Sequence, residues 1–251
     1  TLGCARHWHE RETGDTHADS YLAGLYYDLT DSVRLKAAFN KNIRFPSLRQ
    51  LYDNESGNAS LVTEEVNHYT AGVDLKLPGN ISIRIDGFHS TARNFIEKDK
   101  FDGIFENFDR YLFQGGEIST EIRTVSNLVI GGSYSFLHTD DQSDSGKDEL
   151  QYRPEHRVAL QVKYDFDFGL SSYLSLLHVR NQYYYAKRGD ETRQKELDDY
   201  TVVNFRLTQQ LAGDRVEIYL GADNLFDENY EQSYGLPQPG RVIYAGSEIR
   251  F

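Results

Sequence analysis

The sequence predicts an all-β protein, an antiparallel transmembrane β-barrel with about twelve strands present. Three observations lead to this prediction: apolar and polar side chains alternate in short segments, tyrosine and phenylalanine are abundant, and the connections between segments alternate in length. At 251 residues, the chain is long enough for one or two soluble domains or for a large part of a membrane barrel. The strand pattern has to decide between these classes.

The alternation is clearest near the C-terminus. Between residues 215 and 221, aliphatic side chains occupy every second position, with polar or aromatic side chains between them. The last segment repeats the pattern, and its apolar face holds Ile243, Ala245, Ile249 and Phe251. This period of two is expected of a β-strand with one apolar face. A terminal strand exposes an unpaired edge unless another strand covers it, which a closed barrel provides.

The composition excludes several classes of protein. The chain has 18 Tyr and 14 Phe against one Trp, a bias toward residues that favour strands and membrane interfaces. The apolar runs are too short for a membrane-spanning helix, which needs about 18 residues or more. The net charge of -12 and the lack of a basic stripe exclude nucleic acid as a partner. A single cysteine, Cys4, supplies neither a disulfide framework nor a Cys-based zinc site.

Turn signals divide the chain into strands that are joined alternately by short and long connections. Strands are expected at 1–10, 20–28, 33–40, 66–77, 81–96, 110–124, 128–139, 156–164, 170–185, 199–210, 215–221 and 241–251. Long connections are expected at 11–18, 41–65, 97–109, 140–153, 186–198 and 228–240. All long loops then lie on one side of the sheet, as in barrels with short periplasmic turns and long extracellular loops.

Three stretches resemble the C-terminal half of a TonB-dependent outer-membrane receptor, the family that takes up ferric siderophores, haem or cobalamin. Residues 38–52, with Pro46-Ser-Leu48, and the downstream Gly57-Asn-Ala-Ser-Leu61 are similar to one family strand and its loop. Residues 221–230, with Asn224-Leu-Phe-Asp227, resemble the penultimate strand, and Pro239-Gly-Arg241 leads into the terminal aromatic strand. Their order and spacing make the resemblance specific over residues 33–251.

The resemblance implies a function as well as a fold. Residues 1–251 are expected to be the C-terminal portion of a barrel of about 22 strands, without the plug domain and TonB box that energy-coupled import requires. The expected role is an outer-membrane receptor or transporter for a ferric siderophore or similar metal chelate, with no cofactor and no enzymatic activity. An alternative is a self-contained passive barrel, porin-like or adhesive, and a third is a soluble all-β binding domain.

The resemblance also implies partners. These are a metal-chelate ligand such as a siderophore, outer-membrane lipid and lipopolysaccharide, the barrel assembly machinery, and TonB only through the missing N-terminal part. The assembly machinery is expected to read a signal at Ile249 and Phe251. An alternative role for that terminal aromatic residue is closure of the aromatic girdle at the periplasmic interface.

Basic and aromatic residues in the long loops are candidate ligand-binding residues. Such groups suit an anionic, aromatic iron chelate through charge-assisted hydrogen bonds, stacking and cation–π contacts. Their alternative role is an ordinary aromatic girdle with arginines paired to acids or lipopolysaccharide phosphate. The candidates are Arg44, Arg49, Tyr52, Tyr183, Tyr185, Arg188, Arg193, Tyr230 and Tyr234.

Metal and catalytic sites are not predicted. His7 and His9 fall on one face of a strand, but a metal would need a third ligand from a neighbouring strand. The acidic loop 140–149 lacks the spacing of an EF-hand. The chain has no Gly-x-Ser-x-Gly, no His-Glu-x-x-His and no phosphate-binding glycine loop. No histidine lies between Phe45 and Leu61, which argues against haem as the ligand.

Overall fold

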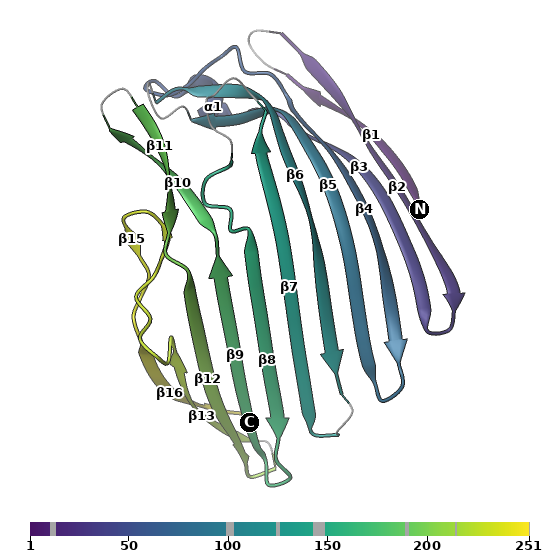
Figure 1. Cartoon of the computed structure of the whole chain (residues 1–251), viewed down its shortest axis with the longest axis vertical. Coiled ribbons are helices and arrows are strands. Elements are labelled where there is room, and N and C mark those ends of the chain that lie inside the picture. The colour runs from purple at the N-terminus through teal and green to yellow at the C-terminus, as the bar shows by residue number, and fades with distance from the viewer. Residues whose placement is uncertain are drawn as a thin grey trace.

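The strands form one curved antiparallel sheet in a computed structural model that describes residues 1–10, 14–98, 103–123, 126–142, 149–188, 191–213 and 215–250 (Figure 1). Twelve strands pair in the order in which they follow along the chain. They are β1 (Leu2–His9), β2 (Thr16–Thr30), β3 (Val33–Arg44), β4 (Glu64–Leu77), β5 (Ile81–Lys98), β6 (Phe105–Ile122), β7 (Leu128–Asp141), β8 (His156–Asp165), β9 (Leu170–Arg180), β12 (Tyr200–Leu211), β13 (Val216–Asp223) and β16 (Val242–Ile249).

Smaller elements lie in the long connections. They are helix α1 (Leu48–Tyr52), the hairpin β10 (Gln182–Arg188) and β11 (Glu191–Leu197), and the short pair β14 (Glu231–Ser233) and β15 (Leu236–Pro237). Helix α1 has five residues, and the described residues include no helix that is long and apolar enough to cross a membrane. Figure 1 shows α1, β10, β11 and β15 at one end of the sheet and the tight turns at the other. The predicted alternation of short and long connections is confirmed.

The two faces of the sheet differ in polarity. The strand register places apolar residues opposite apolar residues, and polar residues opposite polar residues, on neighbouring strands. Ile85 pairs with Val73 on β4 and with Ile118 on β6, and one position away Arg84 pairs with Asp74 and Ser119. The first row belongs to an apolar face that is exposed to the surroundings. Its members include Ile85, Ile118, Leu160, Leu174, Leu220, Ile243 and Ile249. The second row belongs to a polar face that continues on β7 and β8.

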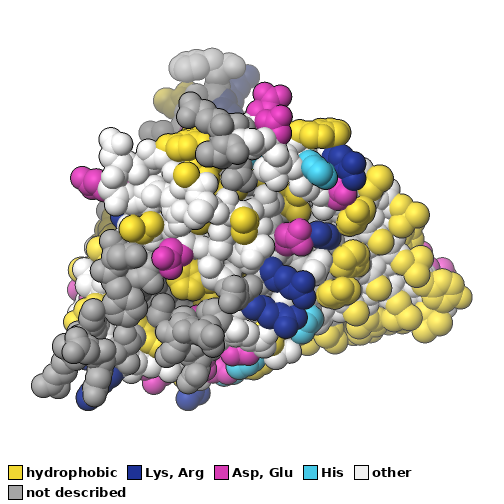
Figure 2. Space-filling view, turned by 90° about the horizontal axis from the view of Figure 1, so that it is seen from above, with side chains coloured by type: hydrophobic (Ala, Val, Ile, Leu, Met, Phe, Trp, Pro, Cys, Tyr) yellow, Lys and Arg dark blue, Asp and Glu magenta, His cyan; other side chains and the backbone are white. Residues whose placement is uncertain are grey.

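The part of the chain that the structure describes forms no second layer of the kind that buries apolar side chains in a soluble sandwich. The buried apolar clusters among the described residues lie at the long-loop end. One consists of Leu51, Leu61 and Ile96, with Phe105 packed against it. The other consists of Val179, Tyr200 and Val202. Viewed from above, Figure 2 shows many hydrophobic side chains exposed on one side of the molecule. An exposed apolar face that extends over strands from β5 to β16 is typical of a sheet in contact with lipid.

Several predicted boundaries were wrong, and two connections differ most from the prediction. The connection expected at 97–109 is mostly strand, because β5 and β6 continue to pair as far as Lys98 and Phe105. The strand expected at 170–185 ends at Arg180, where Asn181 has a φ of 56° and its N–H donates to Asp199 over 3.0 Å. The chain then forms the β10–β11 hairpin, so the loop expected at 186–198 contains strand residues. In both places, pairing within a long connection extends the β-structure.

The two terminal strands do not pair with each other in the described part of the chain. β1 hydrogen-bonds with β2, and β16 hydrogen-bonds with β13, so the sheet is open at both edges. A barrel closed on itself would pair residues 1–10 with the last strand, and the described residues show no such pairing. Phe251 of the predicted assembly signal lies outside the described residues, whereas Ile249 lies on the apolar face and is 57% exposed.

A substitution at Gly115 on β6 tests how closely the backbones of β6 and β7 approach each other. A Cβ at this position would collide with the carbonyl oxygen of Phe136 on β7, a backbone atom that cannot rotate away. We expect Gly115→Ala to lower the free energy of unfolding by about 1–3 kcal/mol, the usual effect of overpacking. Gly24→Ala is the matched control, since no atom lies within 4 Å of its added Cβ. Urea unfolding in detergent measures both variants, and equal stabilities would contradict the packing shown here.

Candidate functional site

The predicted ligand-binding residues all lie at the long-loop end of the sheet, in two groups. Arg44 ends β3, and Arg49 and Tyr52 lie on α1. The other group lies on β10, on β11 and around the β14–β15 pair, which carry Tyr183, Tyr185, Arg188, Arg193, Tyr230 and Tyr234. The hairpin β10–β11 contacts β14, so the structure brings the second group together. Helix α1 of the first group packs instead against Ile96 of β5.

The first loop, residues 45–63, is folded by its own polar side chains. Ser47 caps α1: its hydroxyl accepts from the N–H of Gln50 over 3.3 Å, and its N–H donates to the Gln50 side chain over 2.9 Å. This reciprocal capping box satisfies donors that a helix start leaves free. Gly57 follows where a Cβ would collide with the backbone of Asp53. The loop therefore turns back tightly over the β-sheet end.

Two asparagines attach this loop to the extended β5–β6 hairpin. The Asn58 side chain donates to the carbonyl of Phe105 over 2.9 Å. The Asn107 side chain accepts from the N–H of Val62 over 2.9 Å and donates to the carbonyls of Val62 and Asn94. Leu61 is 2% exposed in the cluster beneath them. The segment Gly57-Asn-Ala-Ser-Leu61 therefore serves loop architecture, a role that its sequence pattern alone did not reveal.

Arg44 is committed to a structural ion pair. Its guanidinium donates through Nε and Nη2 to the carboxylate of Glu64, whose side chain is only 4% exposed. The same carboxylate accepts from the N–H of Ile96 over 2.6 Å. Burial of a carboxylate is tolerated when it is paired and hydrogen-bonded in this way. The candidate role of Arg44 in ligand binding thus competes with a contact that it already makes.

Arg49 and Tyr52 are the accessible members of the first group. The Arg49 side chain is 78% exposed, with Nε 3.9 Å from the carboxylate of Asp53, and Tyr52 is 41% exposed. The pKa of Asp53 lies below its usual range because the carboxylate accepts from the N–H of Glu55 and from Ser56. Asp53 therefore stays ionised beside the arginine, and an exposed pair of this kind is weak enough to exchange partners.

Aromatic stacking organises the second group. Tyr234 stacks on Tyr184 with ring centroids 4.4 Å apart and planes 10° apart. Tyr230 packs on Tyr200 at 4.4 Å, and Tyr200 is only 5% exposed above Val179 and Val202. Offset aromatic pairs at such distances contribute about 0.5–1.5 kcal/mol beyond area burial. The Tyr184–Tyr234 pair holds the β14–β15 segment against the hairpin, and the Tyr200–Tyr230 pair holds the start of this segment against β12.

Tyr183 and Tyr185 point to different environments. The Tyr185 hydroxyl donates to the carbonyl of Glu149 over 2.8 Å, so it ties the 149–155 segment to β10. Burial raises the pKa of the Tyr183 hydroxyl, and the carboxylates of Glu149 and Glu196 raise it further. This hydroxyl stays protonated at neutral pH and can donate a hydrogen bond. Tyr234 is 60% exposed and Arg193 is exposed, whereas the side chain of Arg188 lies outside the described part.

Asn224 and Asp227 clamp the loop that precedes the last strand. Asn224 is 4% exposed; its side chain donates to the carbonyls of Glu228 and Pro239 and accepts from the N–H of Glu228 over 2.8 Å. The Asp227 carboxylate accepts from the N–H of Arg241 over 2.7 Å. The segment Asn224-Leu-Phe-Asp227 therefore fastens both ends of this loop. The sequence indicates these residues as a motif, but it does not reveal that their side chains hold the loop in place.

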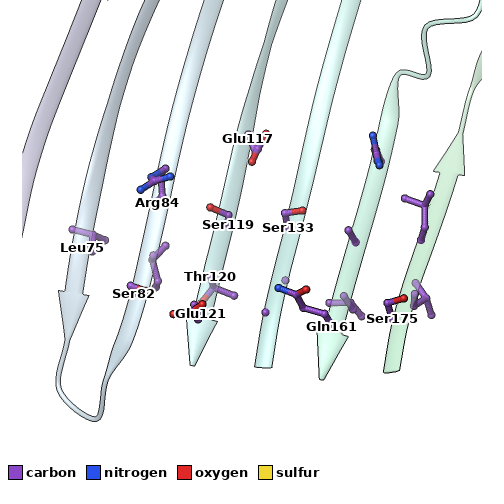
Figure 3. A pocket seen from close by; sticks show the side chains of 18 of the residues that line it. Leu75, Ser82, Arg84, Glu117, Ser119, Thr120, Glu121, Ser133, Gln161 and Ser175 are labelled. Atoms are coloured by element: carbon purple, nitrogen blue, oxygen red, sulfur yellow. The ribbon is translucent and has the colours of Figure 1, made fainter. Parts of the chain in front are cut away.

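The polar face of the sheet is hollowed. A cavity of about 730 Å³ lies against it, and Figure 3 shows side chains from neighbouring strands along its wall. Charged groups compensate one another close to this wall: Lys36 lies 2.8 Å from Asp74 and 3.0 Å from Asp86, and Arg84 lies 3.2 Å from Asp74. The labelled residues that line the cavity are Leu75, Ser82, Arg84, Glu117, Ser119, Thr120, Glu121, Ser133, Gln161 and Ser175.

The described residues contain no group of three or more histidine, cysteine, aspartate or glutamate side chains that could hold a metal. His7 and His9 have other neighbours: His7 Nε2 lies 2.9 Å from the hydroxyl of Ser20, and the His9 ring lies 4.9 Å from the ring of Phe45. That no metal binds at this pair stays a prediction. Much of the acidic loop 140–149 lies outside the described residues.

Comparison with known proteins identifies the family. Residues 2–225 match the sequence model of the family described as TonB dependent receptor-like, beta-barrel. The chain belongs to the TonB-dependent receptor family. The predicted fold class is thereby confirmed, with the sheet open rather than closed in this chain. The family and the similar proteins are receptors and transporters, not enzymes.

Similar sequences include a vitamin B12 transporter, BtuB, of Photobacterium profundum. It is 25% identical over 234 residues, which cover 90% of this chain and 36% of BtuB. A BtuB of Vibrio cholerae serotype O1 is also 25% identical, over 240 residues that cover 90% of this chain and 36% of the relative. The TonB-dependent receptor chain thus spans about a third of the length of the curated relatives that it matches.

Similar structures include the ferric-catecholate import receptor Fiu from K12 E. coli, with a TM-score of 0.75 and 18% identity. The siderophore receptor PirA from Acinetobacter baumannii has a TM-score of 0.77 and 16% identity. The match to Fiu covers 94% of this chain and 35% of Fiu. The match to PirA covers 95% of this chain and 41% of PirA. At these identities the likeness shows the shared receptor-barrel fold.

The buried carboxylate of Glu64 offers a test of the first loop. Glu64→Ala leaves the Arg44 guanidinium and the Ile96 N–H without their partner, and we expect the local opening free energy to fall by about 3 kcal/mol. Hydrogen exchange at the Ile96 and Leu51 amides measures this loss. Glu65→Ala is the control: the Glu65 side chain, which lies 3.0 Å from Lys41, is 35% exposed against 4% for Glu64, and its loss should change the exchange free energy by less than about 1 kcal/mol. Equal protection in both variants would refute the anchoring role of Glu64.

Proposed function

We propose that this chain forms part of the wall of an outer-membrane receptor or transporter that takes up a metal chelate, with the extracellular loops as its binding surface. The observation that carries the proposal is the division of one sheet into an exposed apolar face and a hollowed polar face. Such a sheet suits lipid on one side and a water-filled lumen on the other. Energy-coupled import requires the plug and TonB box, which belong to other parts of such a receptor.

The open edges support a larger barrel. β1 and β16 each present one row of backbone groups to no other described strand, and an unpaired backbone edge cannot remain inside a bilayer. Further strands of the same receptor would satisfy both edges and bring the total toward about 22, as in plugged outer-membrane transporters. The alternative of a self-contained passive barrel needs β1 to pair with β16, which the structure does not show among its described residues.

The accessible loop residues favour an anionic, aromatic chelate. Arg49 and Arg193 offer guanidinium groups, and Tyr52 and Tyr234 offer exposed rings. Together they can form charge-assisted hydrogen bonds with chelate oxygens and stack on catechol-like rings. The similarity to siderophore receptors and to vitamin B12 transporters supports a metal chelate as the ligand class. The exposed Arg49 guanidinium favours an anionic siderophore over an uncharged corrinoid as the ligand.

Ligand binding by the complete barrel proposed above, with this chain as part of its wall, tests this proposal. Titration with a ferric tris-catecholate, followed by quenching of tyrosine fluorescence, should show binding that Arg49→Gln combined with Tyr234→Ala weakens at least about tenfold, through one charged contact and one stacking contact. Cyanocobalamin serves as the comparison ligand. The control is Arg215→Gln, in the short turn before β13, combined with Tyr173→Ala, on the polar face away from the long loops. If both double variants bind like the original chain, these residues are not the ligand site.

We also propose that Ile249 and Phe251 form the signal read by the barrel assembly machinery. A chain carrying a secretion signal and lacking Phe251 should give less folded, heat-modifiable protein in the outer-membrane fraction than the unaltered chain. Phe168→Ala removes an aromatic side chain from a short turn, where it is 66% exposed, and should leave accumulation unchanged. Normal accumulation without Phe251 would overturn the assembly role.

A further inference from the structure

The last two strands of the sheet carry the same Tyr-x-Gly motif. β13 reads Tyr219-Leu-Gly221, and β16 reads Tyr244-Ala-Gly246. The strands are antiparallel neighbours (Figure 1), and their register places Tyr219 opposite Gly246 and Tyr244 opposite Gly221. These two Tyr–Gly pairs lie on the polar face, because Leu220 between them belongs to the apolar face. The motif is therefore complementary to a second copy of itself.

Each tyrosine ring lies over the glycine that stands opposite it. A Cβ added to Gly221 would collide with the Tyr244 ring, and a Cβ added to Gly246 would collide with the Tyr219 ring. The two ring centroids are 6.3 Å apart, and both tyrosines are half-buried. A glycine inside a strand has no side chain to pack, and a ring from the neighbouring strand fills this space. The two strands thus fit together through side chains as well as through backbone hydrogen bonds.

The alternation of polar and apolar residues does not by itself fix the register of β13 and β16. A slip of one residue would turn the apolar side chains to the wrong face, whereas a slip of two residues restores both faces. A tight turn fixes the register of the strands that it joins, and such a turn joins β12 to β13. Residues 224–241 join β13 to β16 instead, and so long a connection leaves the register open.

The Tyr–Gly pairs distinguish the observed register from both slips of two residues. A slip in one direction would place Tyr219 opposite Tyr244, and a slip in the other direction would place Gly221 opposite Gly246. In either case, both glycines lose the ring that covers them. Packing between directly opposed side chains is the interaction that stabilises one strand pairing over another. Among these three registers, only the observed one satisfies both motifs.

A second pair of strands shows the same kind of packing. β7 and β8 are also joined by a long connection, residues 142–155. The Gln161 side chain lies over Gly131, which stands directly opposite it, and the Leu160 side chain approaches the opposed Gly132 on the other face. Large side chains over opposed glycines therefore occur in two pairs of strands that no short turn aligns.

We propose that the two Tyr–Gly pairs set the register of the terminal strand. A slip of two residues would move β16 by about 6–7 Å along its axis. Ile249 of the proposed assembly signal would move with it, relative to the short-turn end of the sheet. The pairs lie on the polar face, whereas Ile249 lies on the apolar face. The two features are therefore separate, and each can be altered without the other.

Disulfide trapping within the complete barrel proposed above measures this register. Ile218 stands directly opposite Ser247, and after a slip of two residues it would stand opposite Ala245 or Ile249. Ile218→Cys is therefore combined in turn with Ser247→Cys, Ala245→Cys or Ile249→Cys, each together with Cys4→Ser. Directly opposed residues are close enough for a disulfide, and diagonal ones are not. The register ratio is the yield of the 218–247 disulfide divided by the summed yield of the other two, measured by mass spectrometry of the linked peptides.

Exchange of the motif residues tests the pairs themselves. Tyr219→Gly combined with Gly221→Tyr places ring opposite ring and glycine opposite glycine, and should lower the register ratio at least about fivefold, because two cross-strand contacts are lost. The further changes Tyr244→Gly and Gly246→Tyr make the two motifs complementary again and should restore the ratio. Tyr173→Ala is the control: this ring on the polar face stands opposite Lys163 on β8 and Arg206 on β12 rather than a glycine, and the ratio should not change.

An unchanged register ratio after the exchange on β13 alone would overturn the proposal. A double exchange that leaves the ratio low, or that yields no folded barrel, would also overturn it. An exchange on β13 that prevents folding supports the proposal only if the double exchange folds in the original register. A lower ratio in the control variant would show that loss of any ring on this face shifts the strands, and would contradict a specific role of the Tyr–Gly pairs.

Discussion

The continuous antiparallel register of the twelve strands is the constraint on which the rest of the structure depends. Each neighbouring pair keeps apolar positions opposite apolar ones, from Val73, Ile85 and Ile118 on β4 to β6 to Leu220 and Ala245 on β13 and β16. A slip of one residue between any two strands would turn every following side chain to the other face. The two faces, and hence the membrane and lumen sides, exist because no such slip occurs.

The structure of the long loops depends on a different kind of interaction. Their folding depends on buried polar side chains that satisfy backbone groups, as Glu64 does for Ile96 and Asn224 does for Glu228. Such groups stabilise a loop when every partner is present and destabilise it when one is lost. The segments that resemble the family thus build the platform, and residues exposed on it, such as Arg49 and Tyr52, are accessible to a ligand. Tyr234 combines both roles, because its ring stacks on Tyr184 and is still 60% exposed.

Much of this fold could be predicted from the sequence, because a period of two and a regular order of turns report strand faces and strand direction. The predicted alternation of loops and the polar and apolar faces are confirmed. The extension of β5 and β6 was missed because Ile96 and Phe105 are held by contacts with α1 residues far away in the sequence. The roles of Tyr184 and Tyr200, and the pairing of Tyr219 with Gly246, depend on cross-strand neighbours that spacing along the chain does not reveal.

The assignment of the two faces can be measured directly with nitroxide spin labels placed in this chain within the complete barrel proposed above, reconstituted into liposomes. Oxygen, which concentrates in the hydrocarbon, should strongly increase the relaxation rate of labels at Ile85 and Ile118. Labels at their neighbours Arg84 and Ser119, which face each other on the polar side, should respond to a water-soluble nickel complex instead. The account predicts this reversal within one residue on both strands. Equal responses at adjacent positions, or the opposite assignment, would contradict it.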